Sequence, residues 1–258
     1  LAGEHVLLIG PPGTAKSELA RRLHHAFDGA LYFERLLTRF STPEELFGPL
    51  SLKALEDDRY ERLVAGYLPT AGIAFLDEVF KANSAILNAL LTLLNEREFD
   101  NGAGRSATPL ISVVAASNEV PADEALLAFF DRFLVRVPVR PVSDAAFEAL
   151  LTLAPAAAAP VAPLSAAERA ALVATRDRVV LGADALAALH ALRALLAERG
   201  QTASDRRWRR FVALLRTAAA SEQRAEVDAL DLWLAAYVVA PDPADAGVFE
   251  DWFVSRIA

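Results

Sequence analysis

The sequence contains no cysteine and no methionine among its 258 residues. Without cysteine, neither a disulfide framework nor a thiolate-ligated metal site can form. No apolar run approaches the roughly 20 residues that a membrane-spanning helix requires, and no secretory signal opens the chain. We therefore expect a cytoplasmic protein with no membrane span. Because position 1 is leucine, we also expect the natural product to begin upstream of it.

The chain has few histidines and a net negative charge. The four histidines have no spacing typical of a metal site; they are His5, His24, His25 and His190. The formal net charge is −8, which opposes non-specific nucleic-acid binding, so we do not expect nucleic acid as the main partner, although a local basic patch remains an alternative. Hydrophobic residues make up 54% of the chain and charged residues 23%, which is typical of a globular protein with one large domain or two smaller ones.

A glycine-rich loop lies near the start of the chain. The apolar run Val6–Ile9 is followed by GPPGTAKS at 10–17 and then by an amphipathic segment that begins at Glu18. A strand, a glycine loop with Lys-Ser and a helix are the order of a phosphate-binding loop. Backbone N–H groups of such a loop and the helix N-terminus face a polyphosphate. Lys16 would contact the β- and γ-phosphates, and the Ser17 hydroxyl would bind Mg²⁺.

One position departs from the general phosphate-loop pattern, because Ala15 stands where glycine usually precedes the lysine. A methyl group is tolerated there if the residue is close to the right-handed helical region, at the first turn of the helix. We expect that conformation for Ala15. The predicted nucleotide contacts are Gly10, Pro11, Pro12, Gly13, Thr14, Ala15, Lys16, Ser17, Glu18 and Asp77.

Two acidic residues end a second apolar run, Ile73–Glu78. Ligands of open parallel sheets bind at the carboxyl ends of the strands. We expect Asp77 to hold Mg²⁺ together with Ser17, and Glu78 to take a proton from an attacking water. Asn118 ends the next apolar strand, where its amide would orient that water.

Two arginines are candidates for sensing or stabilising phosphate charge. Arg132 follows a predicted helix and would reach a phosphate bound to a neighbouring subunit; its alternative role is a surface ion pair with Asp131 or Glu124. Arg206 opens a helix of the C-terminal region and would sense the γ-phosphate, although Arg207 remains an alternative. The run RRWRR at 206–210 also allows interpretation as a nucleic-acid patch, but we favour a helix with Trp208 in its core.

Hydrophobic periodicity predicts an α/β domain followed by a small α-helical domain. Expected strands cover 6–9, 31–33, 73–78, 110–116 and 134–139, with helices between them and inserted hairpins at 49–72 and 99–109. The five strands would form a parallel sheet. We assign 1–140 to the α/β domain, part of which would lie upstream of residue 1. We assign 141–164 to an Ala/Pro-rich linker that is mobile over 154–163, and 165–258 to a wholly helical lid.

Seven segments resemble the RavA subgroup of MoxR-type AAA+ ATPases. They are GPPGTAKS (10–17), TRFSTPEELFGPLS (38–51), YERLVAGYLP (60–69), FLDEVFKANSAILNALLTLLNERE (75–98), AASNE (115–119), DRF (131–133) and SDRRW (204–208). Alanine before the lysine is usual in MoxR members. The resemblance implies an AAA+ P-loop core with a lid, and a Mg²⁺-dependent ATPase that uses ATP. Its motifs place Walker A at 10–17, Walker B at 73–78, sensor 1 at Asn118, the arginine finger at Arg132 and sensor 2 at Arg206.

The same resemblance implies a hexameric ring that remodels or assembles protein partners as a chaperone does, often partners with a von Willebrand factor A domain. Both inserted segments would face the pore. Residues that contact adenine would largely precede residue 1, with His5 and Val6 near that pocket. The alternative is a nucleic-acid or chelatase-type AAA+ motor. An inactive binding protein is disfavoured by the complete site. A GTPase is disfavoured because no Asn-Lys-x-Asp motif occurs.

Overall fold

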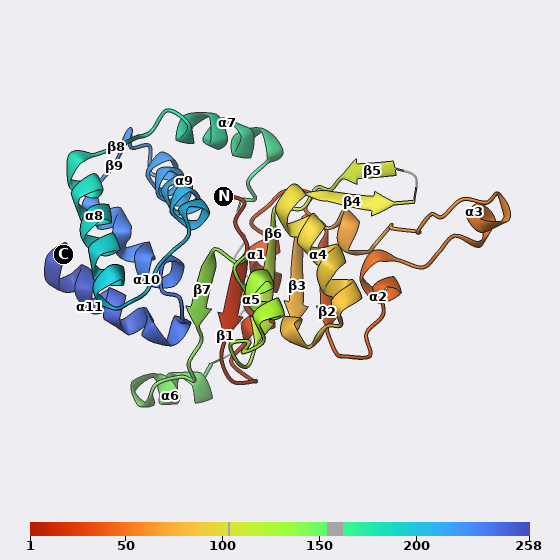
Figure 1. The fold of residues 1–258 in the computed structure, drawn as a ribbon, viewed down its shortest axis with the longest axis horizontal. Helices are drawn as coiled ribbons and strands as arrows, with labels where there is room; N and C mark the ends of the chain where they lie inside the picture. The colour runs from red at the N-terminus through yellow and green to blue at the C-terminus, as the bar shows by residue number, and fades with distance from the viewer. Residues whose placement is uncertain (103, 154–161) are drawn as a thin grey trace. The chain divides into compact units, whose positions relative to one another are not determined.

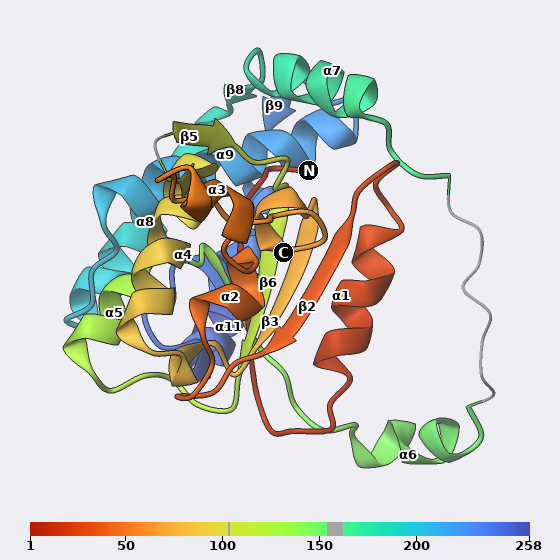
Figure 2. The ribbon, with the colours of Figure 1, turned by 90° about the vertical axis from the view of Figure 1, so that its right-hand side faces the viewer.

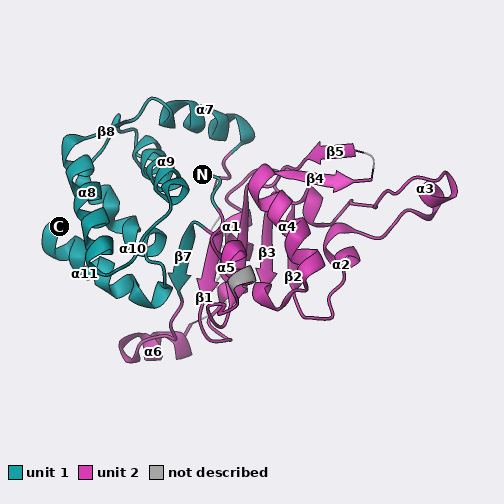
Figure 3. Ribbon diagram, in the orientation of Figure 1, with its two compact units in different colours: residues 1–4, 134–138, 165–258 teal, residues 5–133, 139–164 magenta. Residues whose placement is uncertain are grey.

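The structure is a computed structural model that describes residues 1–102, 104–153 and 162–258. The chain divides into two compact units (Figure 3). We call residues 5–133 and 139–164 the sheet unit, and residues 1–4, 134–138 and 165–258 the helical unit. Each unit has its own buried apolar core.

A five-stranded sheet has the order β2-β3-β6-β1-β7, which confirms the expected α/β fold (Figure 1). The pairs β2·β3, β3·β6 and β6·β1 run parallel. Because the chain leaves each parallel strand at the same edge, the segments after β1, β3 and β6 are brought together. The strands are β1 (Val6–Ile9), β2 (Tyr32–Leu36), β3 (Ile73–Asp77), β6 (Ser112–Ser117) and β7 (Val135–Pro138).

Helices cover both faces of the sheet, as the continuous apolar strands require. All six residues of β6 are buried. Figure 2 shows α1 (Lys16–His24) on one face and α2 (Pro43–Phe47), α4 (Ser84–Glu96) and α5 (Glu124–Phe130) on the other. Local signals fix two of the helix starts, because Thr42 forms a capping box with Glu45 before α2, and Asn83 caps α4 by accepting from Ile86 N–H.

The two inserted segments of the sheet unit are joined to each other. β4 (Glu98–Asn101) and β5 (Gly104–Ala107) form the expected antiparallel hairpin. The hairpin predicted over 49–72 is correct only in its stem: one antiparallel bridge pairs Leu50 with Arg62, and the helix α3 (Leu52–Glu56) lies between them. The Asn101 side chain accepts from Arg62 N–H at 2.7 Å and donates to Arg62 C=O at 3.2 Å. These two hydrogen bonds hold the two inserted segments together.

Short elements complete the sheet unit. They are the 3-10 turns η1 (Leu68–Thr70) and η2 (Val79–Lys81), and the helix α6 (Asp144–Leu151). The expected linker at 141–164 thus contains a helix. The prediction of mobility over 154–163 falls on residues of which 154–161 lie outside the described part of the chain.

The helical unit is built mainly from α7 (Ala166–Arg176), α8 (Ala183–Glu198), α9 (Asp205–Ser221), α10 (Ala235–Val238) and α11 (Ala246–Arg256), with the 3-10 turns η3 (Ala229–Leu234) and η4 (Pro243–Asp245). Ser165 and Glu168 form a capping box at the start of α7. The expectation of a wholly helical lid is wrong in one detail, because β8 (Val180–Leu181) and β9 (Glu226–Val227) pair in parallel. Two residues per strand are too few for sequence periodicity to reveal.

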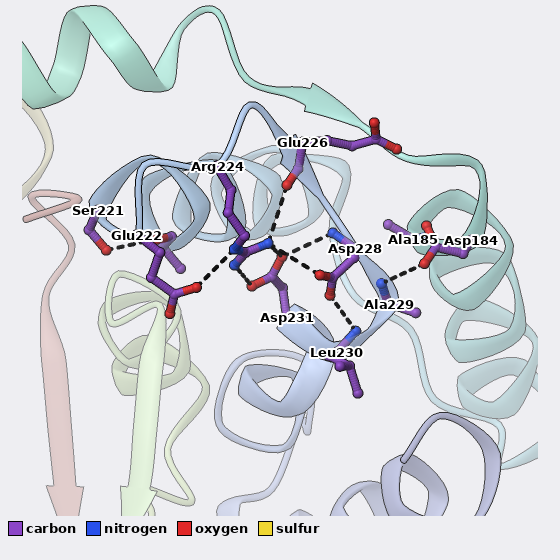
Figure 4. Close-up of polar contacts among 11 residues, drawn as sticks. Asp184, Ala185, Ser221, Glu222, Arg224, Glu226, Asp228, Ala229, Leu230 and Asp231 are labelled. Carbon is purple, nitrogen blue, oxygen red and sulfur yellow. Dashed lines mark hydrogen bonds and ion pairs between the residues drawn. The ribbon is translucent and has the colours of Figure 1, made fainter.

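Arg224 precedes β9 and makes hydrogen bonds and ion pairs with acidic residues on both sides of that strand (Figure 4). Arg224 donates through both terminal nitrogens to the buried carboxylate of Asp231, at 2.9 and 2.5 Å, and through Nε to Glu222 at 2.8 Å. The hydrogen bond with Asp231 raises the pKa of Arg224. Nearby, Asp184 accepts from Ala229 and Ala185 N–H groups, which lowers the pKa of its carboxyl group. This paired arrangement is structural, because a charge with little exposure needs a partner.

Among the described residues, no helix combines the length and the apolar character needed to cross a bilayer.

Candidate active site

Three strand ends meet around one cavity of the sheet unit, as the parallel topology predicts. The segment after β1 is the glycine loop, β3 ends in Asp77, and Asn118 directly follows β6. The cavity has a volume of about 380 Å³ and is lined by Pro12, Gly13, Thr14, Ala15, Lys16, Ser17, Asp77, Glu78 and Asn118. Nine residues singled out from the sequence are therefore brought together.

The two glycines of the loop serve different purposes. A Cβ on Gly10 would lie 2.0 Å from the carbonyl oxygen of Val139, so close backbone approach excludes any side chain there. Gly13 instead has a φ of +80° with open space around it, a backbone conformation that other residues rarely adopt. Both requirements follow from the path of the loop over the strand ends.

Ala15 corrects one expectation from the sequence. It has φ 59° and ψ 25°, in the left-handed region, and it is the residue immediately before α1. We predicted a right-handed conformation. The left-handed backbone of a non-glycine residue costs roughly 1–2 kcal/mol, so the loop holds this alanine in a strained conformation beside the cavity.

Lys16 is turned back onto its own loop. Its ammonium group donates to the carbonyl oxygens of Gly10 and Pro11, both at 2.8 Å, and lies 3.5 Å from the Thr14 hydroxyl. The side chain is buried, so these acceptors replace the water that a buried ammonium would otherwise lose. Gly10 and Pro11 thus contribute through their carbonyl groups and do not line the cavity.

Ser17 and Asp77 provide hard oxygen donors on the same cavity wall. One oxygen of Asp77, Oδ1, accepts from the Glu78 N–H at 3.0 Å. Mg²⁺ in nucleotide sites is bound by one or two protein oxygens, with phosphate and water completing its shell. A hydroxyl and a carboxylate lining one phosphate-sized cavity fit that requirement.

Glu78 is held on both sides of its carboxylate. Asn118 donates its side-chain N–H to Oε1 at 2.5 Å, and the Lys81 ammonium lies 3.2 Å from Oε2. The Glu78 side chain is only 15% exposed. Its backbone is left-handed as well, with φ 53° and ψ 44°, because the chain turns sharply from β3 into η2. Such strain at a carboxylate in a cavity is typical of functional sites.

Sequence reasoning assigned no role to Lys81. The residue stands three positions after Glu78, and a single 3-10 turn brings residues at that spacing together. The sequence signal for this contact is a lysine three residues after the acid that ends the strand.

Three predicted residues lie elsewhere. Glu18 is exposed in the first turn of α1 and pairs with Arg22 at 2.9 Å. Arg132 follows α5, where its N–H donates to Phe129 C=O, and it does not line the cavity. Arg206 is an exposed residue of α9 in the helical unit. Its neighbour Arg207 is buried and donates to the carbonyl oxygens of Leu134 and Val238 at 3.0 and 2.7 Å.

His5 is a buried residue of the sheet unit. It accepts from Val113 N–H at Nδ1 (2.9 Å), and its Nε2 lies 3.0 Å from Leu94 C=O. The acceptor role of Nδ1 places the ring proton on Nε2 and leaves the imidazole neutral. Both ring nitrogens are therefore committed to the backbone of the core, and the position of His5 near adenine stays a prediction.

Two family models match the chain. One, for the MoxR domain in the MoxR-vWA-beta-propeller ternary systems, matches residues 1–159, which is more than half of the sequence. The other, for an AAA lid domain, matches residues 184–253. The phosphate loop, the strand-end acids and Asn118 all lie within the first match.

Three curated relatives each align with about half of the chain. Two uncharacterised proteins of Methanocaldococcus jannaschii are each 59% identical over 141 residues, and a structural protein of the Acidianus two-tailed virus is 31% identical over 144 residues. These alignments cover 54%, 54% and 53% of this chain. The chain spans 38%, 37% and 23% of the lengths of those relatives.

A solved structure shares the whole fold. A crystal structure from Cytophaga hutchinsonii, described as a "putative ATPase", superimposes with a TM-score of 0.71. The alignment covers 100% of this chain and 86% of the other at 18% identity, so it supports the arrangement of elements alone.

Proposed function

Because this chain belongs to the MoxR family of AAA+ ATPases, we propose that it hydrolyses ATP in a Mg²⁺-dependent reaction with Glu78 as the general base. One observation carries the proposal: the Glu78 carboxylate, held by Asn118 at 2.5 Å, lines the same cavity as the phosphate loop. A nucleophilic water and a γ-phosphate could share that cavity within reach of both residues.

The loop would bind the phosphates through its backbone and Lys16. The ammonium group would exchange the carbonyl oxygens of Gly10 and Pro11 for phosphate oxygens, which carry full negative charge. Ser17 and Asp77 would hold Mg²⁺, which when bound neutralises charge on the β- and γ-phosphates. The buried start of α1 would add the positive end of its dipole.

Glu78 would take the proton of the attacking water. The amide of Asn118 would orient this carboxylate and the water, and Lys81 would compete for the second carboxylate oxygen. Each donor lowers the basicity of the carboxylate, so loss of the Lys81 contact would make Glu78 a stronger base. The left-handed backbone of Glu78 supports its assignment as the base, because this conformation fixes the position of the Cβ atom from which the carboxylate extends.

We further propose a ring, as in the RavA subgroup that the motifs resemble. In a hexamer, Arg132 would reach a neighbour's γ-phosphate, and Arg206 would couple nucleotide state to movement of the lid. The ring would remodel or assemble protein partners. A protein with a von Willebrand factor A domain is the favoured partner, since the matching family is described from systems that contain one.

Phosphate release tests the catalytic part of the proposal. We expect slow ATP hydrolysis that requires Mg²⁺ and that Lys16→Ala reduces to background, while Lys53→Ala, an exposed lysine of α3, retains the parental rate. Equal rates for the parental protein and Lys16→Ala would overturn the assignment of the loop.

A trap variant tests the partner. Glu78→Gln, saturated with ATP, should retain proteins from a lysate of the source cells, and mass spectrometry should identify a von Willebrand factor A protein among them. Recovery of nucleic acid without protein would instead favour the nucleic-acid motor.

Mixed assemblies test action between subunits. Arg132→Ala and Glu78→Gln should each be inactive alone, and mixtures should regain activity because an intact Glu78 can face an intact Arg132. Mixtures without recovered activity would contradict a role for Arg132 between subunits.

A further inference from the structure

Trp208 lies where two cavities of the helical unit adjoin. Their volumes are about 350 and 430 Å³, and both are lined by Trp208, Arg209 and Val212. The apolar lining residues Leu186, Leu189, Trp208 and Val212 form what we call the floor. Four arginines from α7, α8 and α9 line one or both of the cavities: Arg176, Arg193, Arg209 and Arg216. We call these eight residues the Trp208 groove.

The structure divides the basic run at 206–210 between different environments. Arg207 is buried against backbone carbonyl groups, and Arg210 pairs with Glu4 within the helical unit. Only Trp208 and Arg209 of the run line the groove. The cluster read from the sequence as a possible nucleic-acid patch is therefore not one surface, and the groove draws its other arginines from more distant positions.

The groove is positively charged on an acidic protein. Four arginines and two aspartates, Asp177 and Asp205, line the two cavities, which gives a local charge of 4 − 2 = +2 on a chain of −8. Arg176 is paired with Asp177 at 2.7 Å. Arg193 and Arg209 are exposed, and the buried Nε of Arg216 has no hydrogen-bond partner among the described residues. The guanidinium groups of Arg193 and Arg209 are therefore accessible to an acidic ligand, whereas Arg216 lines the cavity with its Nε buried.

A segment of the same chain has the complementary character. None of the eight residues of α6 is buried. Phe147, Leu150 and Leu151 share one helical face at i, i+3 and i+4 and are 53%, 47% and 69% exposed. Asp144 and Glu148, four residues apart, lie together beside that face, and residues 141–153 contain no basic side chain. Among the described residues neither carboxylate takes part in a hydrogen bond or an ion pair, so α6 presents an exposed, acidic amphipathic surface.

We propose that α6 of one copy of this chain binds in the Trp208 groove of a second copy. The apolar face of α6 would cover the groove floor, and its charge of −2 would meet the local charge of +2. Such a contact joins two different surfaces, so it repeats head to tail and closes into a ring or continues as a filament. The contact goes beyond ATP hydrolysis, and its test uses no nucleotide.

A peptide is favoured over a nucleic acid by the floor of the groove. Three of its four apolar residues are aliphatic, and these offer no flat surface for base stacking. Trp208 packs against Phe211 with ring centroids 6.5 Å apart. A polyanionic chain would also meet the overall charge of −8 as it extends beyond the groove.

Fluorescence anisotropy of a labelled peptide tests the contact. The probe is a synthetic peptide of residues 141–153, added to the full chain without nucleotide. We expect saturable binding that Arg193→Glu with Arg209→Glu weakens by about tenfold, because two attractive charge pairs become repulsive. Arg256→Glu, an exposed arginine of α11 outside the groove, should bind as the parental chain does. Thermal melts should confirm that all three proteins are equally folded.

A charge exchange separates this proposal from its alternatives. A peptide with Asp144→Lys and Glu148→Lys should bind the parental chain poorly and regain affinity for the doubly reversed chain. A scrambled peptide of the same composition that binds equally well would overturn the assignment to α6, as would tighter binding of a 20-nucleotide single-stranded DNA.

Sedimentation of the full chain measures self-association directly. Phe147→Ser should weaken self-association, and unchanged self-association would contradict the proposal. None of these outcomes depends on the ATPase assignment.

Discussion

The side-chain amide of Asn118 donates to Oε1 of Glu78 at 2.5 Å, across the carboxyl ends of β6 and β3. The two residues are 40 positions apart in the sequence, and only the parallel pairing of their strands brings them together. The amide therefore fixes the orientation of the proposed base.

Loss of this contact should impair hydrolysis without unfolding the protein. We expect Asn118→Ala to lower kcat by about 10²-fold, because an unpositioned base is less effective. Asn118→Asp should be at least as severe, since two neighbouring carboxylates cannot both ionise readily. Asn95→Ala, an exposed asparagine of α4, is the matched control. Steady-state phosphate release measures the effect, and a parental kcat in Asn118→Ala would contradict this role.

The left-handed backbone of Ala15 predicts an unusual response to glycine. Ala15→Gly should be neutral or should stabilise the protein by up to about 1 kcal/mol, because relief of strain offsets the added freedom of the unfolded chain. If Ala15 were right-handed, Ala15→Gly would instead lower the free energy of unfolding by about 1 kcal/mol. Urea unfolding without nucleotide measures the difference. Destabilisation by Ala15→Gly would show that the residue is not left-handed.

His5 should be a stability residue. His5→Ala leaves the Val113 N–H and the Leu94 C=O without their partner in the core. We expect a loss of about 2–4 kcal/mol in the free energy of unfolding. His25→Ala, at an exposed position after α1, should cost less than about 0.5 kcal/mol. Equal effects of the two substitutions in urea unfolding would contradict the assignment.

The neighbouring arginines of α9 should differ in kind. Arg207→Ala removes a buried guanidinium that holds two backbone carbonyl groups, so we expect a loss of about 2–4 kcal/mol in stability. Arg206→Ala should leave the thermal midpoint nearly unchanged while ATP hydrolysis falls by about tenfold or more. Differential scanning calorimetry and phosphate release separate the effects. If Arg207→Ala kept its stability but lost hydrolysis, Arg207 and not Arg206 would be the residue that senses the nucleotide.

Much of the fold follows from local patterns in the sequence. Apolar runs that end in polar residues predicted the five strands, and the helix starts after Thr42 and Ser165 carry local capping signals. Those signals act within a few residues, where sequence reasoning is strongest. Strand pairing then explains why the strand-end residues meet.

Other features depend on distant contacts or on backbone strain. The left-handed conformations of Ala15 and Glu78 are imposed by the path of the chain over the strand ends, and no residue type signals them. The role of His5 arises from backbone groups about 90 and 110 residues away. The division of the 206–210 run between buried and exposed faces requires the packing of the whole helical unit.

The central claim is that Glu78 is the base of an ATP-hydrolysing site, and Glu78→Gln tests it most directly. Glutamine keeps the shape of the side chain but cannot accept the proton of water at pH 7. ATP binding, followed with a fluorescent ATP analogue, and phosphate release should be measured on the same preparation. We predict parental nucleotide affinity with hydrolysis reduced by about 10²-fold or more. Parental hydrolysis by Glu78→Gln would contradict the account.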